Sequence, residues 1–208
     1  MKTKLISVLV VTVLLLVACG GGGDKKEHEG HEIKNDSAQH VSTPDDKNIK
    51  TVAVTYTNID AKVAASLKEI VDHYLHIKNA LVNGDGSEAA IGARSMEKAL
   101  RSIDESFFTA DQKKIYDEDE DELKEHAEHI GKKADDIEHQ REHFSLMSEV
   151  VYDLVKSFGG GQPLYHDHCP MYNKDKGGAM WLSEIKEVKN PYFGSQMPKC
   201  GAVEEIIK

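Results

Sequence analysis

Hydrophobic residues recur at spacings of three and four along the middle of the chain, and this period is typical of amphipathic helices. Four such stripes follow one another. They run from Val63 to Leu81, from Ala89 to Phe107, from Ile115 to Ile130 and from Ile137 to Phe158. The pattern therefore predicts four helices, the last of them over about residues 136–158.

Turn and capping residues separate the stripes. Residues 83–86, with the sequence Asn-Gly-Asp-Gly, stop the first stripe, and Ser87 is the expected N-cap of the second helix. Thr109 and Gln112 have the spacing of a capping box for the third helix. Four helices of similar length with short loops predict an all-α, up-down-up-down four-helix bundle over residues 59–158.

The segment that follows, residues 159–208, has a different composition. It combines glycines and aromatic residues with Pro163, Pro170, Pro191 and Pro198. Because proline cannot donate to a helix or to a central strand, we expect an irregular or weakly β tail that packs on the bundle within the same domain.

Residues 1–18 have the pattern of a bacterial secretory signal. Two lysines precede an apolar run from Leu5 to Val17, and Ala18 stands before Cys19 as in a lipobox. The run is shorter than the roughly 20 residues of a membrane helix, although an uncleaved short membrane helix is the alternative. We expect Cys19 to be lipidated and to anchor the protein in the cell envelope, in the periplasm or on the outer membrane.

Residues 19–58 begin with glycines and are polar, with only scattered apolar residues before Val52. Such a segment cannot bury enough apolar surface to fold, so we expect a flexible tether. Its His28 and His31 either catch metal loosely or simply belong to a polar linker.

The charge balance is acidic. The chain contains 26 basic and 36 acidic residues, and removal of Lys2 and Lys4 with the signal leaves 24 basic residues and a formal charge of −12. This balance argues against nucleic acid or anionic lipid as a partner and is compatible with the collection of cations.

Cysteine, methionine and histidine occur together only near the C-terminus. Residues 166–171 read His-Asp-His-Cys-Pro-Met, and residues 197–201 read Met-Pro-Lys-Cys-Gly. Thiolate and thioether sulfur favour Cu(I), and imidazole suits copper, zinc and nickel. The sequence therefore predicts a metal site, for Cu(I) first and for zinc or another heavy-metal ion second. Its predicted ligands are Cys169, Met171, Met197, Cys200, His166 and His168.

A disulfide is the alternative for the two cysteines. In an oxidising compartment Cys169 and Cys200 are either metal ligands or a bridge. A bridge would close a long loop and contribute roughly 3 to 4 kcal/mol in the chain-entropy model. It would not explain the methionines and histidines beside the cysteines.

Six further histidines form three pairs on the predicted helices. The pairs are His73 and His76, His126 and His129, and His139 and His143. Spacings of three and four place both members of a pair on one helix face, and up-down topology brings all six to one end of the bundle. They are a second candidate metal site, or an ordinary solvated charge pattern. A di-iron centre is not expected, because the required Glu-x-x-His motifs are absent.

Several segments together resemble Domain of Unknown Function family 3347, over about residues 60–205. They are His73–Val82, Ile137–Phe144, Cys169–Asn173, Trp181–Ser183, and Asn190–Gly194 continuing through Met197 to Cys200-Gly201. Members of that family occur as exported lipoproteins and as appendages of adaptor subunits in heavy-metal efflux pumps. The resemblance implies a copper-linked role in the envelope.

The cysteine segments are also similar to short heavy-metal-binding modules of copper transporters. Those modules pair Cys-Pro-Met-His with a later Cys-x-x-Cys-Gly-Met, and residues 169–171 and 200–201 match this pattern. The chain departs from it at Tyr172, Met197 and Ala202, where the modules have histidine, cysteine and methionine. These departures leave the coordination number open.

The sequence thus predicts a non-enzymatic protein that binds copper, or another soft or borderline ion, for buffering or for transfer to efflux components. The alternative is an interaction module that docks on an efflux adaptor and is stapled by a Cys169–Cys200 disulfide. An enzyme is not expected, because the chain shows no nucleophile with a paired base, no phosphate-binding loop and no fixed carboxylate pair.

Overall fold

The computed structural model describes residues 49–208, which form four α-helices and a four-stranded sheet. The helices are α1 Ala61–Val82, α2 Gly86–Arg101, α3 Ala110–Lys132 and α4 Ile137–Phe158. The strands are β1 Lys50–Val52, β2 Leu164–Cys169, β3 Ala179–Ser183 and β4 Ala202–Ile207. The predicted signal, the lipidation site Cys19 and the histidines His28 and His31 lie outside the described residues. Within residues 49–208, every helix is too short or too polar to cross a bilayer.

The helices begin where polar side chains can accept hydrogen bonds from the first free amides. Asp60 caps α1 and Asp136 caps α4. Thr109 and Gln112 form a complete capping box at the start of α3, as their spacing predicted. These local signals fix three of the four helix starts at the expected positions.

α2 differs from the prediction at both ends. Its N-cap is Asp85 and not Ser87, because the Asp85 carboxylate accepts the hydrogen bond from a backbone amide of the first turn. The helix ends at Arg101, before the end of the hydrophobic stripe. Ile103 and Phe107 follow in a loop with a 3-10 turn and still pack against the core. A hydrophobic stripe therefore marks buried positions here and not helix length.

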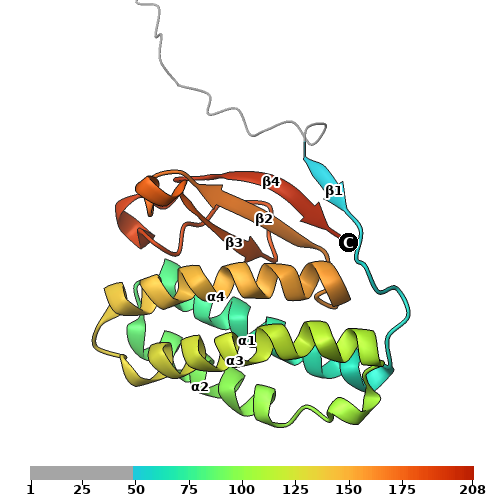
Figure 1. Ribbon diagram of the computed structural model, residues 1–208. Helices are drawn as coiled ribbons and strands as arrows, with labels where there is room; N and C mark the ends of the chain where they lie inside the picture. Colours follow the sequence, from blue (N-terminus) through green and yellow to red (C-terminus); the bar gives the residue numbers. More distant parts are fainter. Residues whose placement is uncertain (1–48) are drawn as a thin grey trace, which may run out of the picture. The chain divides into compact units, whose positions relative to one another are not determined.

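The four helices pack as a bundle around one hydrophobic core (Figure 1). α1 packs against α2, α2 against α3, and α3 against α4. Between α1 and α4, the buried rings of Tyr74 and Phe144 are stacked with centroids 5.1 Å apart. The predicted helical bundle is confirmed at this level.

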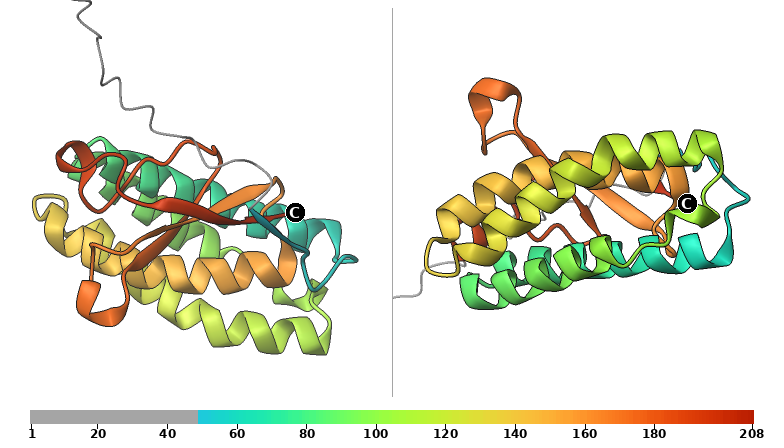
Figure 2. Two further views of the ribbon diagram at one scale, coloured as in Figure 1. Left: turned by 90° about the horizontal axis from the view of Figure 1, so that it is seen from above. Right: turned by 60° about the horizontal axis from the view of Figure 1, so that its bottom comes forward.

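The C-terminal segment adds a sheet, so the expected all-α class is only partly right and the domain is α+β. The strand order is β1-β4-β2-β3, with β1 parallel to β4 and β2 antiparallel to both of its neighbours. β3 packs against α4, and β4 lies farther from the helices (Figure 1). Seen from above, the sheet lies over α1 and α4 (Figure 2).

The first described strand, β1, begins at Lys50, within the segment 19–58 expected to be a tether. β1 pairs with β4, and the amides of Thr55 and Tyr56 then donate to carbonyls at the end of α4. The Tyr56 ring stacks on Phe158 at 5.4 Å. Val52, Val54 and Tyr56 stand in a polar context, which is too weak a pattern to predict a strand. The partner strand also lies about 155 residues away in the chain, so no local signal indicates the pairing.

Side-chain hydrogen bonds hold the sheet and its loops on the bundle. The Tyr74 hydroxyl of α1 accepts a hydrogen bond from the Leu182 amide of β3 at 2.9 Å. The Arg141 guanidinium of α4 donates to the Pro191 carbonyl at 3.1 Å. The C-terminal segment is thus tied to α1 and to α4, the two helices beneath it.

Candidate metal-binding sites

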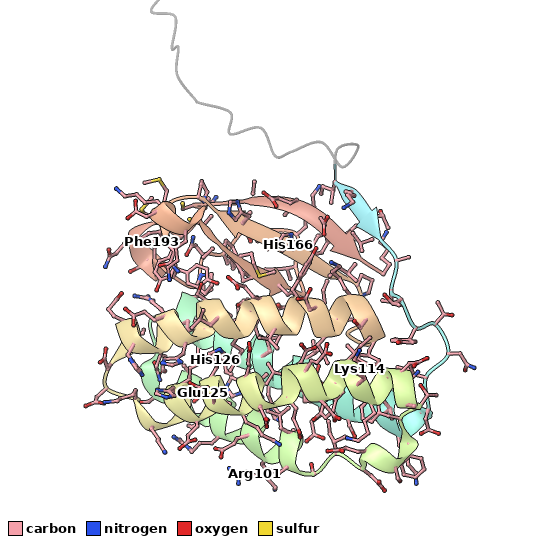
Figure 3. The ribbon with its side chains drawn as sticks, viewed as in Figure 1. Arg101, Lys114, Glu125, His126, His166 and Phe193 are labelled. Carbon is pink, nitrogen blue, oxygen red and sulfur yellow. The ribbon has the colours of Figure 1, made fainter. Side chains whose placement is uncertain are left out.

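Four histidines face one another across the hairpin of α3 and α4. His126 and His129 lie in the last turns of α3, and His139 and His143 lie in the first turns of α4. A short turn joins the two helices, so residues near it share one level of the bundle. Figure 3 shows His126 between α3 and α4. These four residues are called the four-histidine cluster.

Ring nitrogens in the cluster approach one another in two close pairs. Nδ1 of His126 lies 3.2 Å from Nδ1 of His143, and Nδ1 of His129 lies 3.2 Å from Nε2 of His139. His129, His139 and His143 each offer one ring nitrogen, and these nitrogens lie within 4.8 Å of one another. The His143 ring also stacks on His129, with centroids 4.0 Å apart. Three imidazoles therefore converge on one small space, and His126 adjoins them through its contact with His143.

The surroundings of the cluster favour neutral imidazole. Burial lowers the pKa of His126, against the opposing effect of Glu125 and Glu122. Burial, together with the charges of the neighbouring histidines, lowers the pKa of His143 to about 4. Neutral imidazole is the form that binds metal. These two side chains are therefore in their coordinating form at neutral pH.

The hairpin that carries the cluster is fixed against α2 by Gln140. The Gln140 side-chain amide donates to the carbonyl oxygens of Gly86 at 2.8 Å and Ile130 at 3.1 Å. On the solvent side, an open pocket adjoins the cluster and is lined by Glu128, His129, Lys132 and Lys133. The cluster is thus held on one side and open to solvent on the other.

The two remaining predicted bundle histidines lie on α1, beside carboxylates. Nε2 of His73 is 3.8 Å from Glu69, and Nε2 of His76 is 2.7 Å from Glu88 of α2. The structure therefore brings together four of the six bundle histidines and places the other two beside separate surface carboxylates.

The two tail cysteines face each other. Cys169 ends β2 and is buried, Cys200 precedes β4 and is partly exposed, and their sulfur atoms are 2.7 Å apart. A disulfide requires about 2.05 Å, whereas two thiolates on one tetrahedral zinc lie about 3.8 Å apart. The observed separation is between these values, so a small movement leads to either state. Burial and the adjacent Cys169 thiol raise the pKa of Cys200 to about 11, so a metal ion would have to displace its proton.

The two predicted methionine ligands lie on the surface near the cysteines in sequence. Met171 is 53% exposed and Met197 is 37% exposed, which is unusual for large apolar side chains. The Cys200 amide donates to the Met197 carbonyl at 3.1 Å. Figure 3 shows yellow sulfur atoms at the end of the sheet near Phe193.

The tail histidines do not join the cysteines. Successive side chains of a strand point to opposite faces, so His166 and His168 share one face of β2 while Asp167 and Cys169 share the other. The two predicted histidine ligands thus lie on the opposite face of β2 from Cys169. Sequence reasoning missed Glu204 of β4, which lies beside both histidines. The only signal for it was its position in an acidic pair near the end of the chain.

The fold and these sites define an α+β domain with a histidine cluster between two adjacent helices. A family model described as a protein of unknown function, DUF3347, matches residues 70–162, and this match confirms the resemblance to that family over those residues. The matched stretch contains the whole four-histidine cluster and ends before Cys169. No curated protein and no solved structure matches the chain. The similarity of the cysteine segments to copper-transporter modules stays a prediction.

Proposed function

We propose that the protein binds a borderline transition-metal ion, copper or zinc, at the four-histidine cluster and does so without catalysis. The observation that carries this proposal is the convergence of three imidazoles from two helices, His129, His139 and His143, with His126 beside them and ring nitrogens 3.2 Å apart in two pairs. The nitrogen ligands of tetrahedral zinc lie about 3.3 to 3.4 Å apart, given bonds near 2.0 to 2.1 Å. Two nitrogen pairs already have nearly this separation.

The donor set selects the class of ion. Imidazole nitrogen suits copper, zinc and nickel, whereas Mg²⁺ and Ca²⁺ require oxygen ligands. Cu(I) is better matched by the sulfur atoms of Cys169, Cys200 and the two exposed methionines. The two kinds of site would let one domain hold copper in both oxidation states.

The proposed role is buffering of the ion in the envelope or its transfer to an efflux system. The lipobox at Cys19 and the family's occurrence beside efflux adaptors support this setting, and the open pocket at His129 supports ion exchange. A metal site that is partly open exchanges its ion more readily than a closed structural site.

The test is a count of bound ions. Zinc and Cu(II) are titrated into the purified protein in competition with a chromophoric chelator, and the double variant His139→Ala with His143→Ala is compared with wild type. We expect the variant to lose one bound ion per chain, through a weakening of about 100-fold or more at that site.

The matched control is His73→Ala with His76→Ala. It also removes two histidines from one helix, but these lie in surface pairs with Glu69 and Glu88. It should bind metal as wild type does. Equal binding by both double variants and by wild type would exclude the four-histidine cluster as the site.

The cysteine pair supports a second candidate function. With sulfur atoms 2.7 Å apart, Cys169 and Cys200 are also placed to form a structural disulfide, as in an interaction module that docks on an efflux adaptor. Thiol titration of protein isolated from the envelope without reductant separates the two states. Two thiols that cuprous ion protects would support the metal site, and no thiol until reductant is added would support the staple.

A further inference from the structure

A second group of metal-type ligands lies on the sheet, apart from the four-histidine cluster. His166 and His168 project from one face of β2, and β4 runs beside this strand. The pairing shifts between His166, which faces Glu205, and Asp167, which faces Val203. Glu204 is the extra residue of this irregularity, and a bulge of this kind redirects a side chain. It places the Glu204 carboxylate beside both imidazoles. Figure 3 shows His166 at the sheet and His126 at the helices.

The Glu204 carboxylate approaches each imidazole through a different oxygen. Nδ1 of His168 is 3.3 Å from one oxygen of Glu204, and Nδ1 of His166 is 3.9 Å from the other. Ligand atoms on a tetrahedral metal lie about 3.3 to 3.4 Å apart. The pair of His168 and Glu204 already has this separation, and His166 would have to move closer to complete the set.

The hydrogen bond made by Nε2 of His168 determines whether Nδ1 of the same ring is a donor or an acceptor. Nε2 of His168 lies 3.0 Å from the carbonyl oxygen of Gly177, so this nitrogen carries the proton and donates it. In neutral imidazole, Nδ1 is then an acceptor that faces the acceptor oxygen of Glu204. Two acceptors at this distance repel unless a proton or a metal ion lies between them. A backbone carbonyl that orients the second nitrogen is the usual support of a metal-binding histidine.

The groups around His166, His168 and Glu204 do not compete for contact with these three side chains. Nδ1 of His166 is buried and has no hydrogen-bond partner among the described residues. The next carboxylate, Glu205, is engaged elsewhere, since it accepts hydrogen bonds from Lys50 and Tyr152, both at 2.6 Å. The Tyr152 ring packs against the His166 ring with centroids 4.7 Å apart and limits its movement.

We propose that His166, His168 and Glu204 form a second divalent-metal site, of the His₂–carboxylate type that zinc and Cu(II) accept. Three protein ligands leave a coordination position open to water or to a transfer partner. This site is independent of the four-histidine cluster and of the cysteines, because it uses none of their side chains.

Protection of individual histidines from chemical modification tests the site without interference from other bound ions. The full chain is treated with diethyl pyrocarbonate with and without zinc, and modification of His166 and His168 is followed by peptide mass. We expect zinc to slow both modifications by about tenfold in wild type. This protection should disappear in Glu204→Gln and persist in Glu205→Gln, which alters the adjacent carboxylate.

Zinc protection of His166 and His168 that depends on Glu204 would support the proposed site. No protection in wild type, or equal protection in Glu204→Gln, would overturn the proposal and leave a simple ion pair between Glu204 and a protonated His168. The cluster variant His139→Ala with His143→Ala should keep the protection of His166 and His168. The two metal-binding proposals therefore succeed or fail separately. Circular dichroism of each variant checks that the fold is unchanged.

Discussion

Asp167 of β2 is a buried acidic residue whose carboxylate lacks a hydrogen-bond partner among the described residues. The buried Lys78 ammonium acts on it through its charge but pairs directly with Glu184 at 2.7 Å. Burial raises the pKa of Asp167 to about 7, against the opposing effect of Lys78. The carboxyl group is therefore partly protonated at neutral pH.

We predict that this residue makes the stability of the domain depend on pH. Its pKa is higher in the folded state than the ordinary value of 3.8, so the proton favours folding. That contribution is complete below about pH 4 and is lost as the pH rises through about 7. In Asp167→Asn the site is always neutral, so the stability of the variant relative to wild type should increase between pH 4.5 and 7.5. Urea unfolding at several pH values measures this difference. Parallel curves for the two proteins would contradict the prediction.

At the scale of elements, α4 shows how the helical pattern divides the chain between core and solvent. Leu154 is 1% exposed and belongs to the core, whereas Leu146 on the same helix is 45% exposed. Both residues are leucines within one helix, so the same substitution has the same effect on helix propensity at each.

We predict that Leu154→Ala lowers the free energy of unfolding by about 2 to 5 kcal/mol, because it leaves a cavity in the core. The matched change Leu146→Ala should alter it by only about 0.5 kcal/mol or less. Chemical denaturation measures both values. Similar losses in the two variants would show that α4 does not bury the face assigned to it.

The helices could be predicted because their signals are local. A period near 3.6, polar caps and glycines act within a few residues, and Thr109 with Gln112 is an example that the structure reproduces. The exception is α2, where Asp85 caps the helix two residues before Ser87. The strands could not be predicted in the same way. β2 reads Leu-Tyr-His-Asp-His-Cys, and the buried positions among its polar residues are set by distant partners.

The candidate sites also differ in how far local sequence signals predict them. Sequence spacing predicts that His126, His129, His139 and His143 lie at one end of the bundle. That the flanks of α3 and α4 which carry them face each other depends on the handedness of the bundle, and only the structure shows it. The separation of His76 from them depends on which helix faces which, and sequence does not give that. The meeting of His168 with Glu204 depends on strand pairing and on a bulge. Alternation along β2, which separates His166 and His168 from Cys169, becomes evident only once the strand is recognised.

At the scale of the whole domain, β1 adds the N-terminal part of the described chain to a sheet built from the C-terminal part. Lys50 pairs with Glu205, and Val54 and Tyr56 pack against the core. We predict that a chain starting at residue 59 is less stable than one starting at residue 49, because it loses these contacts and leaves the edge of β4 unpaired. Thermal unfolding of the two chains tests this. Equal melting temperatures would show that β1 contributes nothing to stability.

The pairing of β1 with β4 also determines how the domain responds to mechanical load. The Lys208 amide donates to the Val52 carbonyl at 3.0 Å, so the last residue of the chain lies beside the first strand. Any force that reaches the domain through the chain before Lys50 acts first on β1, which has only three residues. We expect this short strand to detach before the helices yield. A pull from that end would then lengthen the chain by the segment up to α1 and leave the histidine cluster between α3 and α4 intact.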